Sequence, residues 1–118
     1  MAWQVAFADE FHADYQALPE AVQDELLLGV RLLTVYGPNL GRPHVDTLKG
    51  SEFANMKELR FRADDGVWRV AFAFDPKRNA VLLVAGDKSG TSQMRFYKKL
   101  IATADARYRA HLKRLGVS

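Results

Sequence analysis

The sequence contains no cysteine, and its three histidines, His12, His44 and His111, lie far apart. A chain without cysteine can form neither a disulfide framework nor a thiolate metal site, and isolated histidines lack the spacing of zinc ligands. We therefore expect no metal site and no other cofactor. His44 lies in a segment rich in glycine and proline, where a histidine is either a general base or an exposed polar group.

Long apolar runs are also absent. No stretch approaches the roughly 20 apolar residues that cross a membrane. The N-terminal AWQVAFADEF lacks the basic start and the continuous apolar core of a signal peptide. We therefore expect a cytoplasmic protein without a membrane partner. With 118 residues, 48% of them hydrophobic and 26% charged, the composition predicts one globular domain over residues 1–118.

Basic residues are scarce in the first third of the chain. Residues 1–41 carry a single base, Arg31, against six acids, for a net charge of −5. Residues 42–118 carry sixteen bases against eight acids, for a net charge of +8. A domain whose positive charge is concentrated in this way favours a polyanionic partner on its basic part.

Three consecutive antiparallel strands are predicted within residues 55–90. Alternation of apolar and polar residues indicates the first two, and the segment AVLLVA, apolar on both faces, indicates a third strand inside the sheet. The predicted strands cover residues 56–62, 67–74 and 80–85. The segments DDG and DPKRN provide the two turns, because aspartate, glycine, asparagine and proline favour turn conformations.

The first turn sets a register that brings two arginines together. If Arg62 pairs with Val67, Arg60 lies directly opposite Arg69, and Glu58 lies on the same face, one diagonal step from Arg69. Like charges in this position repel one another, at a cost of up to roughly 1 kcal/mol. Either this face is a shallow seat for a phosphate, or Glu58 simply bridges two exposed arginines.

The remaining segments predict the rest of the fold. Alternation indicates a short strand over residues 3–7, and helical spacing of apolar residues indicates helices over 9–18 and 19–36, followed by a loop over 37–55. A long helix capped by Thr91 or Ser92 runs to about residue 115. The order β-α-α-β-β-β-α predicts an α+β fold, with the helices packed on one face of a small antiparallel-meander sheet and a cleft on the other.

The second predicted helix carries more leucine than one buried stripe needs. Leu27, Leu28 and Leu32 extend the stripe beyond the spacing of the core positions. These leucines either pack under the loop that follows or form part of a protein–protein surface.

Four segments, in this order, carry a family resemblance: NMKELRFR, WRVAFAFDP, LLVAGDKSG and RFYKKLIATADARYRAHL. They resemble the RelE/HigB superfamily of bacterial toxins, and most closely its phage-derived, Gp49-like branch. The resemblance extends over residues 3–112 and implies a RelE-like fold. It also implies the toxin of a type II toxin–antitoxin system, which cleaves mRNA, typically on the ribosome. Its partner would be an adjacent antitoxin, expected to be a helix-turn-helix DNA-binding protein.

The resemblance also implies a set of catalytic residues. The family's arginines on the first two meander strands fall on Arg60 and Arg69, and the lysine after the third strand falls on Lys88. The family commonly has a functional aromatic or basic residue near the start of the final helix, and Tyr97 or Phe96 matches it; we expect Tyr97 to be the catalytic one. Lys57 matches a lysine that only some branches use. Strict alternation places Lys57 on the opposite face from Arg60, so it reaches the cleft only through a bulge or a strand edge.

Four further residues are expected to contact RNA: Arg62, Arg95, Phe96 and Lys98. Arg95 and Lys98 lie in the first turns of the final helix, beside the exit of the third strand. The chain departs from many relatives at this exit, where it carries DKSG in place of a longer run, KKTQKTP. Asp87 here replaces a hydrophobic or basic residue.

Cleavage of RNA without a metal requires a general base, a cationic clamp and a proton donor. A lysine surrounded by Arg60, Arg69 and a second lysine has a lowered pKa, so Lys57 or Lys88 is the expected base. Two other functions remain open on the same fold. One is a non-catalytic, ParE-like inhibitor of a protein target such as DNA gyrase, and the other is a plain RNA-binding module.

Overall fold

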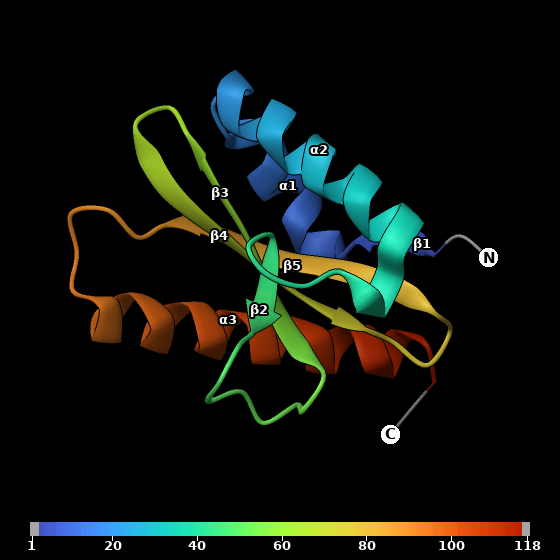
Figure 1. Cartoon of the computed structure of the whole chain (residues 1–118). Helices are drawn as coiled ribbons and strands as arrows, with labels where there is room; N and C mark the ends of the chain where they lie inside the picture. The colour runs from blue at the N-terminus through green and yellow to red at the C-terminus, as the bar shows by residue number, and fades with distance from the viewer. Residues whose placement is uncertain (1–2, 117–118) are drawn as a thin grey trace.

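The computed structural model describes residues 3–116, which form a five-stranded sheet flanked by helices (Figure 1). The elements are, in order, β1 (Gln4–Phe7), α1 (Asp9–Ala17), α2 (Glu20–Tyr36), a 3-10 turn η1 (Gly37–Asn39), β2 (Val45–Thr47), β3 (Met56–Ala63), β4 (Gly66–Phe74), β5 (Asn79–Asp87) and α3 (Gln93–Arg114). None of the helices within residues 3–116 combines the length and the apolar character needed to cross a membrane.

The strands are arranged in the order β1-β5-β4-β3-β2, so the predicted meander β3-β4-β5 forms the centre of the sheet. β1 pairs with β5 in parallel, and the other strands pair antiparallel. The prediction of a plain loop over residues 37–55 is wrong, because this segment contains β2. A strand of three residues, two of them polar, is too short to show alternation.

The predicted register of β3 against β4 is confirmed. Arg60 pairs with Arg69, and Arg62 pairs with Val67. The pairing of Arg62 with Val67 alone would leave four residues in the turn. Ala63 also pairs with Gly66, so the turn is shorter. The two linking residues, Asp64 and Asp65, have φ of 52° and 59°. Positive φ at both central positions is the geometry of a type I′ turn, which matches the twist of a hairpin.

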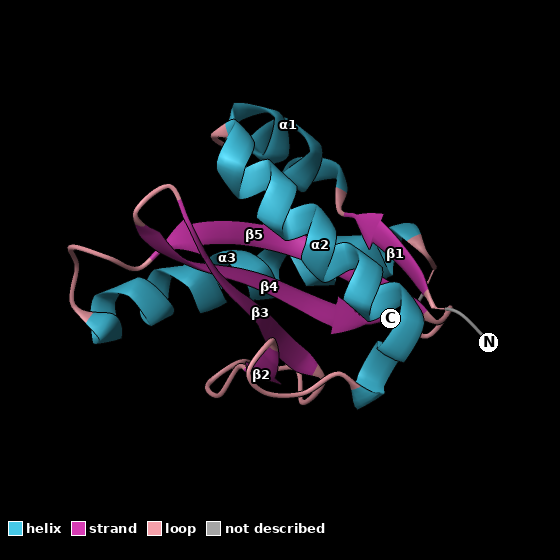
Figure 2. Ribbon diagram, turned by 45° about the horizontal axis from the view of Figure 1, so that its top comes forward, coloured by secondary structure: helices cyan, strands magenta, loops and turns pink. Residues whose placement is uncertain are grey.

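The α+β class is confirmed, and the predicted helices and strands occur in the predicted order with β2 added, but the packing of all helices on one face is wrong. α1 and α2 lie on one side of the sheet and α3 on the other (Figures 1 and 2). Leu59 of β3 faces α2, where a Cβ added at Gly29 would lie 2.6 Å from its Cδ2 atom. Neighbouring side chains of a strand point to opposite faces. Glu58 therefore faces α3, and the Tyr97 hydroxyl of α3 donates to it.

This arrangement changes the role of the alanines in β4. Ala71 and Ala73 share the face of Arg69, which the sequence suggested as a shallow seat for a phosphate. Both are fully buried, because α3 packs over this part of the sheet. Small residues therefore allow a helix to approach the sheet closely, and the open part of this face lies beside the first turns of α3.

The surplus leucines of α2 are not covered by the loop that follows. Leu26 and Leu33 are fully buried, whereas Leu27 is 43% exposed and Leu28 is 51% exposed. The burial interpretation is therefore wrong for these two residues. The protein–protein interpretation of this surface stays a prediction.

The far end of α3 is joined to the turn between β4 and β5 by a buried polar cluster. His111 Nε2 lies 2.8 Å from Asp75 Oδ2, while Asp75 Oδ1 accepts hydrogen bonds from the backbone N–H groups of Lys77 and Asn79. Burial alone would raise the pKa of Asp75. The hydrogen bonds from His111, Asn79 and Lys77 outweigh this effect and lower the pKa below its ordinary value.

Candidate active site

A buried carboxylate forms the floor of the site. Glu58 is 6% exposed and Arg69 is 5% exposed. The Tyr97 hydroxyl donates to Glu58 Oε1 at 2.7 Å, and Arg69 Nε donates to the Tyr97 oxygen at 3.3 Å. Arg69 Nε also lies 3.7 Å from Glu58 Oε1. A buried charge of this kind is retained only with such partners, so β3, β4 and α3 are joined through one polar unit.

Arg60 lies beside this unit between two carboxylates but is bound closely by neither. Its Nη1 atom is 4.0 Å from Asp46 Oδ2, and its Nε atom is 3.9 Å from Glu58 Oε2. The Nε atom is buried and has no hydrogen-bond partner among the described residues. The side chain remains 32% exposed. An arginine with unused donors at a surface hollow is well suited to bind a phosphate.

Lys88 reaches the site from the turn after β5. The Asp87 carboxylate holds this turn by accepting from the backbone N–H groups of Val67 and Ser89, and the Lys88 N–H donates to the Val67 carbonyl at 2.8 Å. Asp87 therefore has a structural role in this turn. Burial and, to a smaller extent, the charges of Arg69 and Arg60 lower the pKa of Lys88. The predicted direction is confirmed, although burial is the larger cause.

Two hollows of about 350 Å³ and 280 Å³ adjoin at Arg60. The larger is lined by Asp46, Glu58, Lys88, Gln93 and Tyr97, together with Arg42, Thr47, Leu48 and Lys49. The smaller is lined by Pro43, Phe61, Arg62, Val67 and Arg69. We call this continuous surface the Arg60 groove. Its cations line two adjoining hollows that share Arg60, an arrangement suited to binding a chain of phosphates.

Four of the five predicted catalytic residues converge on this groove: Arg60, Arg69, Lys88 and Tyr97. Lys57 does not join them. It pairs with Thr47 on one side and Phe72 on the other, on the face that carries α2. The bulge in the sheet lies between β4 and β5 at Ala71/Phe72 and leaves β3 regular, so nothing turns Lys57 toward the groove.

The residues predicted to contact RNA do not all lie at the same surface. Arg62 lines the smaller hollow of the Arg60 groove. Arg95 and Phe96 instead line a third hollow, beside β5. Lys98 is exposed and lines none of these three hollows. The position of Phe96 follows from helical geometry, because consecutive residues point about 100° apart, and Tyr97 already faces Glu58.

Sequence reasoning assigned too small a role to Glu58 and missed Asp46. Alternation on β3 had placed Glu58 with the arginines, but only the covering helix makes it a buried partner of Tyr97 and Arg69. Asp46 lies directly opposite Glu58 on β2, the strand that the sequence did not reveal. A hydrogen bond from the Thr47 N–H and the charges of Arg42 and Arg60 lower the pKa of Asp46.

Comparison with known proteins decides the family. The family model described as phage-derived protein Gp49-like (DUF891) matches residues 13–109. The chain belongs to the Gp49-like family. Among curated relatives of this Gp49-like chain, the putative toxin HigB3 of Mycobacterium tuberculosis is 50% identical over 78 residues, or 66% of each chain. The putative toxin HigB2 of the same organism is 36% identical over 108 residues, or 91% of this chain and 53% of the relative.

The Gp49-like chain therefore spans just under two-thirds of the first relative and about half of the second. Among solved structures, a doubly substituted form of the E. coli toxin RelE in the free state matches with a TM-score of 0.61. The match covers 86% of this chain and 96% of RelE at 12% sequence identity, which supports a shared fold. The resemblance to the RelE/HigB superfamily and its Gp49-like branch is confirmed.

Proposed function

We propose that this chain is the toxin of a type II toxin–antitoxin system and acts as an endoribonuclease on mRNA, bound to the ribosome in the cytoplasm. The observation that carries the proposal is the convergence of Arg60, Arg69 and Lys88 around the buried Glu58–Tyr97 pair, at the floor of an open groove. The curated relatives named as putative toxins support the same biological role. Its partner would be an antitoxin that binds DNA through a helix-turn-helix.

The groove contains the groups that metal-independent RNA cleavage needs. A base removes the proton of the ribose 2′-OH, whose oxygen attacks the adjacent phosphorus. The bond to the 5′-oxygen then breaks, which leaves a 2′,3′-cyclic phosphate, and an acid protonates the departing 5′-oxygen. Arg60 has unused donors and would bind the scissile phosphate, with Arg69 fixing the floor beneath it. Such a clamp acts where negative charge develops in the transition state.

Two groups in the groove can serve as the base. Lys88 has a lowered pKa, so a neutral amine is easier to reach than for an ordinary lysine. Glu58 is the other, because only its Oε1 atom accepts a hydrogen bond from Tyr97, while its Oε2 atom lies beside Arg60 and makes no hydrogen bond within the described residues. Burial and the neighbouring Glu58 raise the pKa of Tyr97, so its hydroxyl keeps its proton at neutral pH. This proton is donated to Glu58 in the structure, so Tyr97 would have to release Glu58 before it could protonate the leaving oxygen.

The proposal is tested by inducing the chain in bacterial cells without an antitoxin and mapping mRNA 5′ ends by primer extension. We expect growth arrest accompanied by new 5′ ends within translated regions. The matched control is Arg60→Met, which should express as a folded protein and leave the ends unchanged. Growth arrest with unaltered mRNA ends but disturbed DNA supercoiling would overturn the proposal of a nuclease. It would favour an inhibitor of a protein target such as gyrase.

A further inference from the structure

The outer edge of β5 is only partly covered. β1 pairs with residues 79–82, and the Ala8 N–H donates to the Leu82 carbonyl at 2.9 Å. The next carbonyl, that of Leu83, accepts from Arg107 Nη1 at 2.8 Å, and the same atom pairs with Asp14 of α1. Beyond this point residues 84–87 have no strand beside them on this side within the described chain. An open strand edge presents backbone donors and acceptors to a partner.

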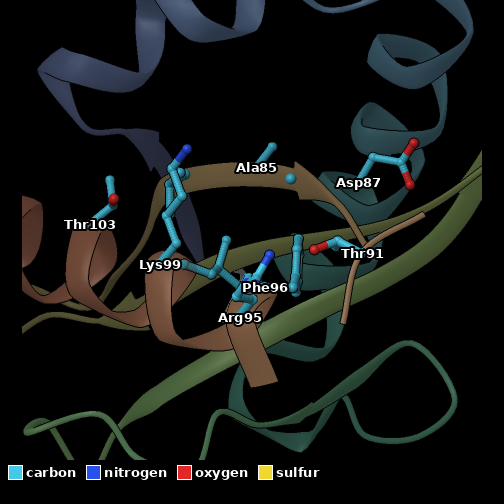
Figure 3. Close-up of a pocket in the computed structure, with 10 residues that line it drawn as sticks. Ala85, Asp87, Thr91, Arg95, Phe96, Lys99 and Thr103 are labelled. Carbon is cyan, nitrogen blue, oxygen red and sulfur yellow. The ribbon is translucent and has the colours of Figure 1, made fainter. Parts of the chain in front are cut away.

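A hollow of about 490 Å³ lies between this open edge and α3 (Figure 3). Its floor is apolar and includes Val84 from β5 and Phe96 and Leu100 from α3. The Phe96 ring lies over Gly86, where an added Cβ would be 2.9 Å from the ring. The edge therefore runs beside a preformed space large enough to bury an apolar side chain of a partner.

The rim of the hollow is basic. Figure 3 shows Lys99 and Phe96 extending from α3 toward β5, with Arg95 beside them. Neither Arg95 nor Lys99 takes part in a salt bridge within the described residues. Among the residues that line the hollow, the one carboxylate is Asp87, which accepts hydrogen bonds from the N–H groups of Val67 and Ser89. This rim would therefore complement negatively charged groups on a partner.

We propose that this hollow binds an extended segment of a partner protein, which adds to residues 84–87 as a further strand. Side chains of a strand alternate between two faces. Residues of the partner that face α3 would place apolar groups over Val84 and Phe96 and acidic groups against Arg95 and Lys99. Main-chain hydrogen bonds would supply affinity, and the hollow with its basic rim would supply specificity.

The observations favour a peptide over RNA at this place. The free groups are those of a strand edge, whose spacing another strand reproduces, and the floor is aliphatic apart from Phe96. The hollow is also distinct from the Arg60 groove. Phe96 faces the hollow, whereas the next residue of α3, Tyr97, faces Glu58 in the groove. The proposal therefore does not depend on RNA cleavage.

The test uses the full chain and a random twelve-residue peptide library displayed on phage. Enriched sequences should alternate apolar residues with aspartate or glutamate. A synthetic peptide of the enriched sequence should shift backbone amide NMR signals of residues 84–87 above all others. Arg95→Glu and Lys99→Glu should each weaken its binding by about tenfold, as expected for a charge pair at an interface. The matched control is Lys113→Glu, which changes the same charge on the same helix outside the hollow.

Several results would overturn the proposal. The library could enrich no sequence, or the peptides could shift signals around Leu27 and Leu28 of α2 instead. An equal loss of binding in Lys113→Glu would mean that only net charge matters. An octameric oligouridylate could displace the peptide and shift the amide NMR signals of residues 84–87 in its place. That result would assign the hollow to RNA. Each variant should unfold at the same temperature as wild type. Measuring thermal unfolding therefore excludes loss of folding as the cause of weaker binding.

Discussion

At the scale of single residues, Arg60 and Arg69 lie opposite each other but in different surroundings. Arg69 is buried against Glu58 and Tyr97, whereas Arg60 is partly exposed and loosely paired. Removing Arg69 leaves a buried carboxylate short of a partner. We therefore expect Arg69→Met to lower the free energy of unfolding by about 2–4 kcal/mol. Arg60→Met should change it by less than about 1 kcal/mol, because repulsion with Arg69 is also relieved.

Urea unfolding of both variants checks this pair. The burial of Arg69 revises the expectation that follows from two exposed arginines, under which Arg69 could be removed at almost no cost. Equal stability losses in the two variants would show that the two arginines share one environment.

The Tyr97 hydroxyl is the donor that most closely satisfies Glu58, at 2.7 Å. Tyr97→Phe removes this donor and keeps the ring, so we expect a loss of about 1–2 kcal/mol in the free energy of unfolding. The matched control is Tyr36→Phe, since Tyr36 is exposed and its hydroxyl makes no hydrogen bond within the described residues. Chemical denaturation of both variants is the measurement. A Tyr97→Phe protein as stable as Tyr36→Phe would contradict the polar floor described for the site.

Individual residues of the site were predictable only where the strand pattern fixes them. Alternation and the turn were enough to place Arg60 opposite Arg69 and Glu58 on their face. They could not show which helix covers this face. The buried state of Glu58 and the separation of Phe96 from Tyr97 depend on that helix and on its rotation about its axis.

At the scale of elements, α2 packs against β3 at a glycine. Gly29 lies in the middle of α2, where alanine would ordinarily favour the helix by about 1 kcal/mol. Its Cβ would lie 2.6 Å from Leu59 Cδ2, so the core must shift to accept it. We expect Gly29→Ala to destabilise the fold by about 1–2 kcal/mol net, because overpacking outweighs the gain in helix propensity.

Gly41→Ala is the matched control, because an added Cβ there meets nothing within 4 Å. Thermal or urea unfolding of the two variants gives the comparison. A Gly29→Ala protein more stable than Gly41→Ala would mean that α2 does not rest on Leu59 at this point.

Long periodic elements were the predictable part of the fold. The two long helices and the strands of the meander have apolar repeats that extend over many residues, and their predicted bounds differ from the observed ones by a few residues at most. β2 was missed because its three residues carry no repeat. The face on which α3 packs was not predictable, since small residues such as Ala71 and Ala73 suit both an open surface and a close helix contact.

At the scale of the whole molecule, the Asp75–His111 cluster joins the end of α3 to the sheet far from the groove. The pKa of Asp75 is lowered in the fold, so its contribution to stability is present above its ordinary value of 3.8 and is lost as pH falls through the lower folded value. We expect Asp75→Asn to cost about 1–2 kcal/mol near neutral pH, with the difference from wild type shrinking below about pH 4.

Urea unfolding between neutral pH and pH 3 is the measurement. Asp64→Asn is the control, since Asp64 is an exposed turn residue and the change should stay within about 0.5 kcal/mol. A stability difference for Asp75→Asn that stays constant down to pH 3 would contradict the role of its carboxylate charge.

The central claim is that RNA is cut on the face of the sheet that carries Arg60. Lys57 offers a matched test, because it is a cation on the same strand and lies on the opposite face. The measurement is the single-turnover rate of mRNA cleavage on translating ribosomes by wild type, Arg60→Met and Lys57→Met. The account predicts about a hundredfold loss for Arg60→Met, as for removal of one transition-state clamp, and less than about a twofold change for Lys57→Met. A hundredfold loss in Lys57→Met with an unchanged rate in Arg60→Met would contradict it.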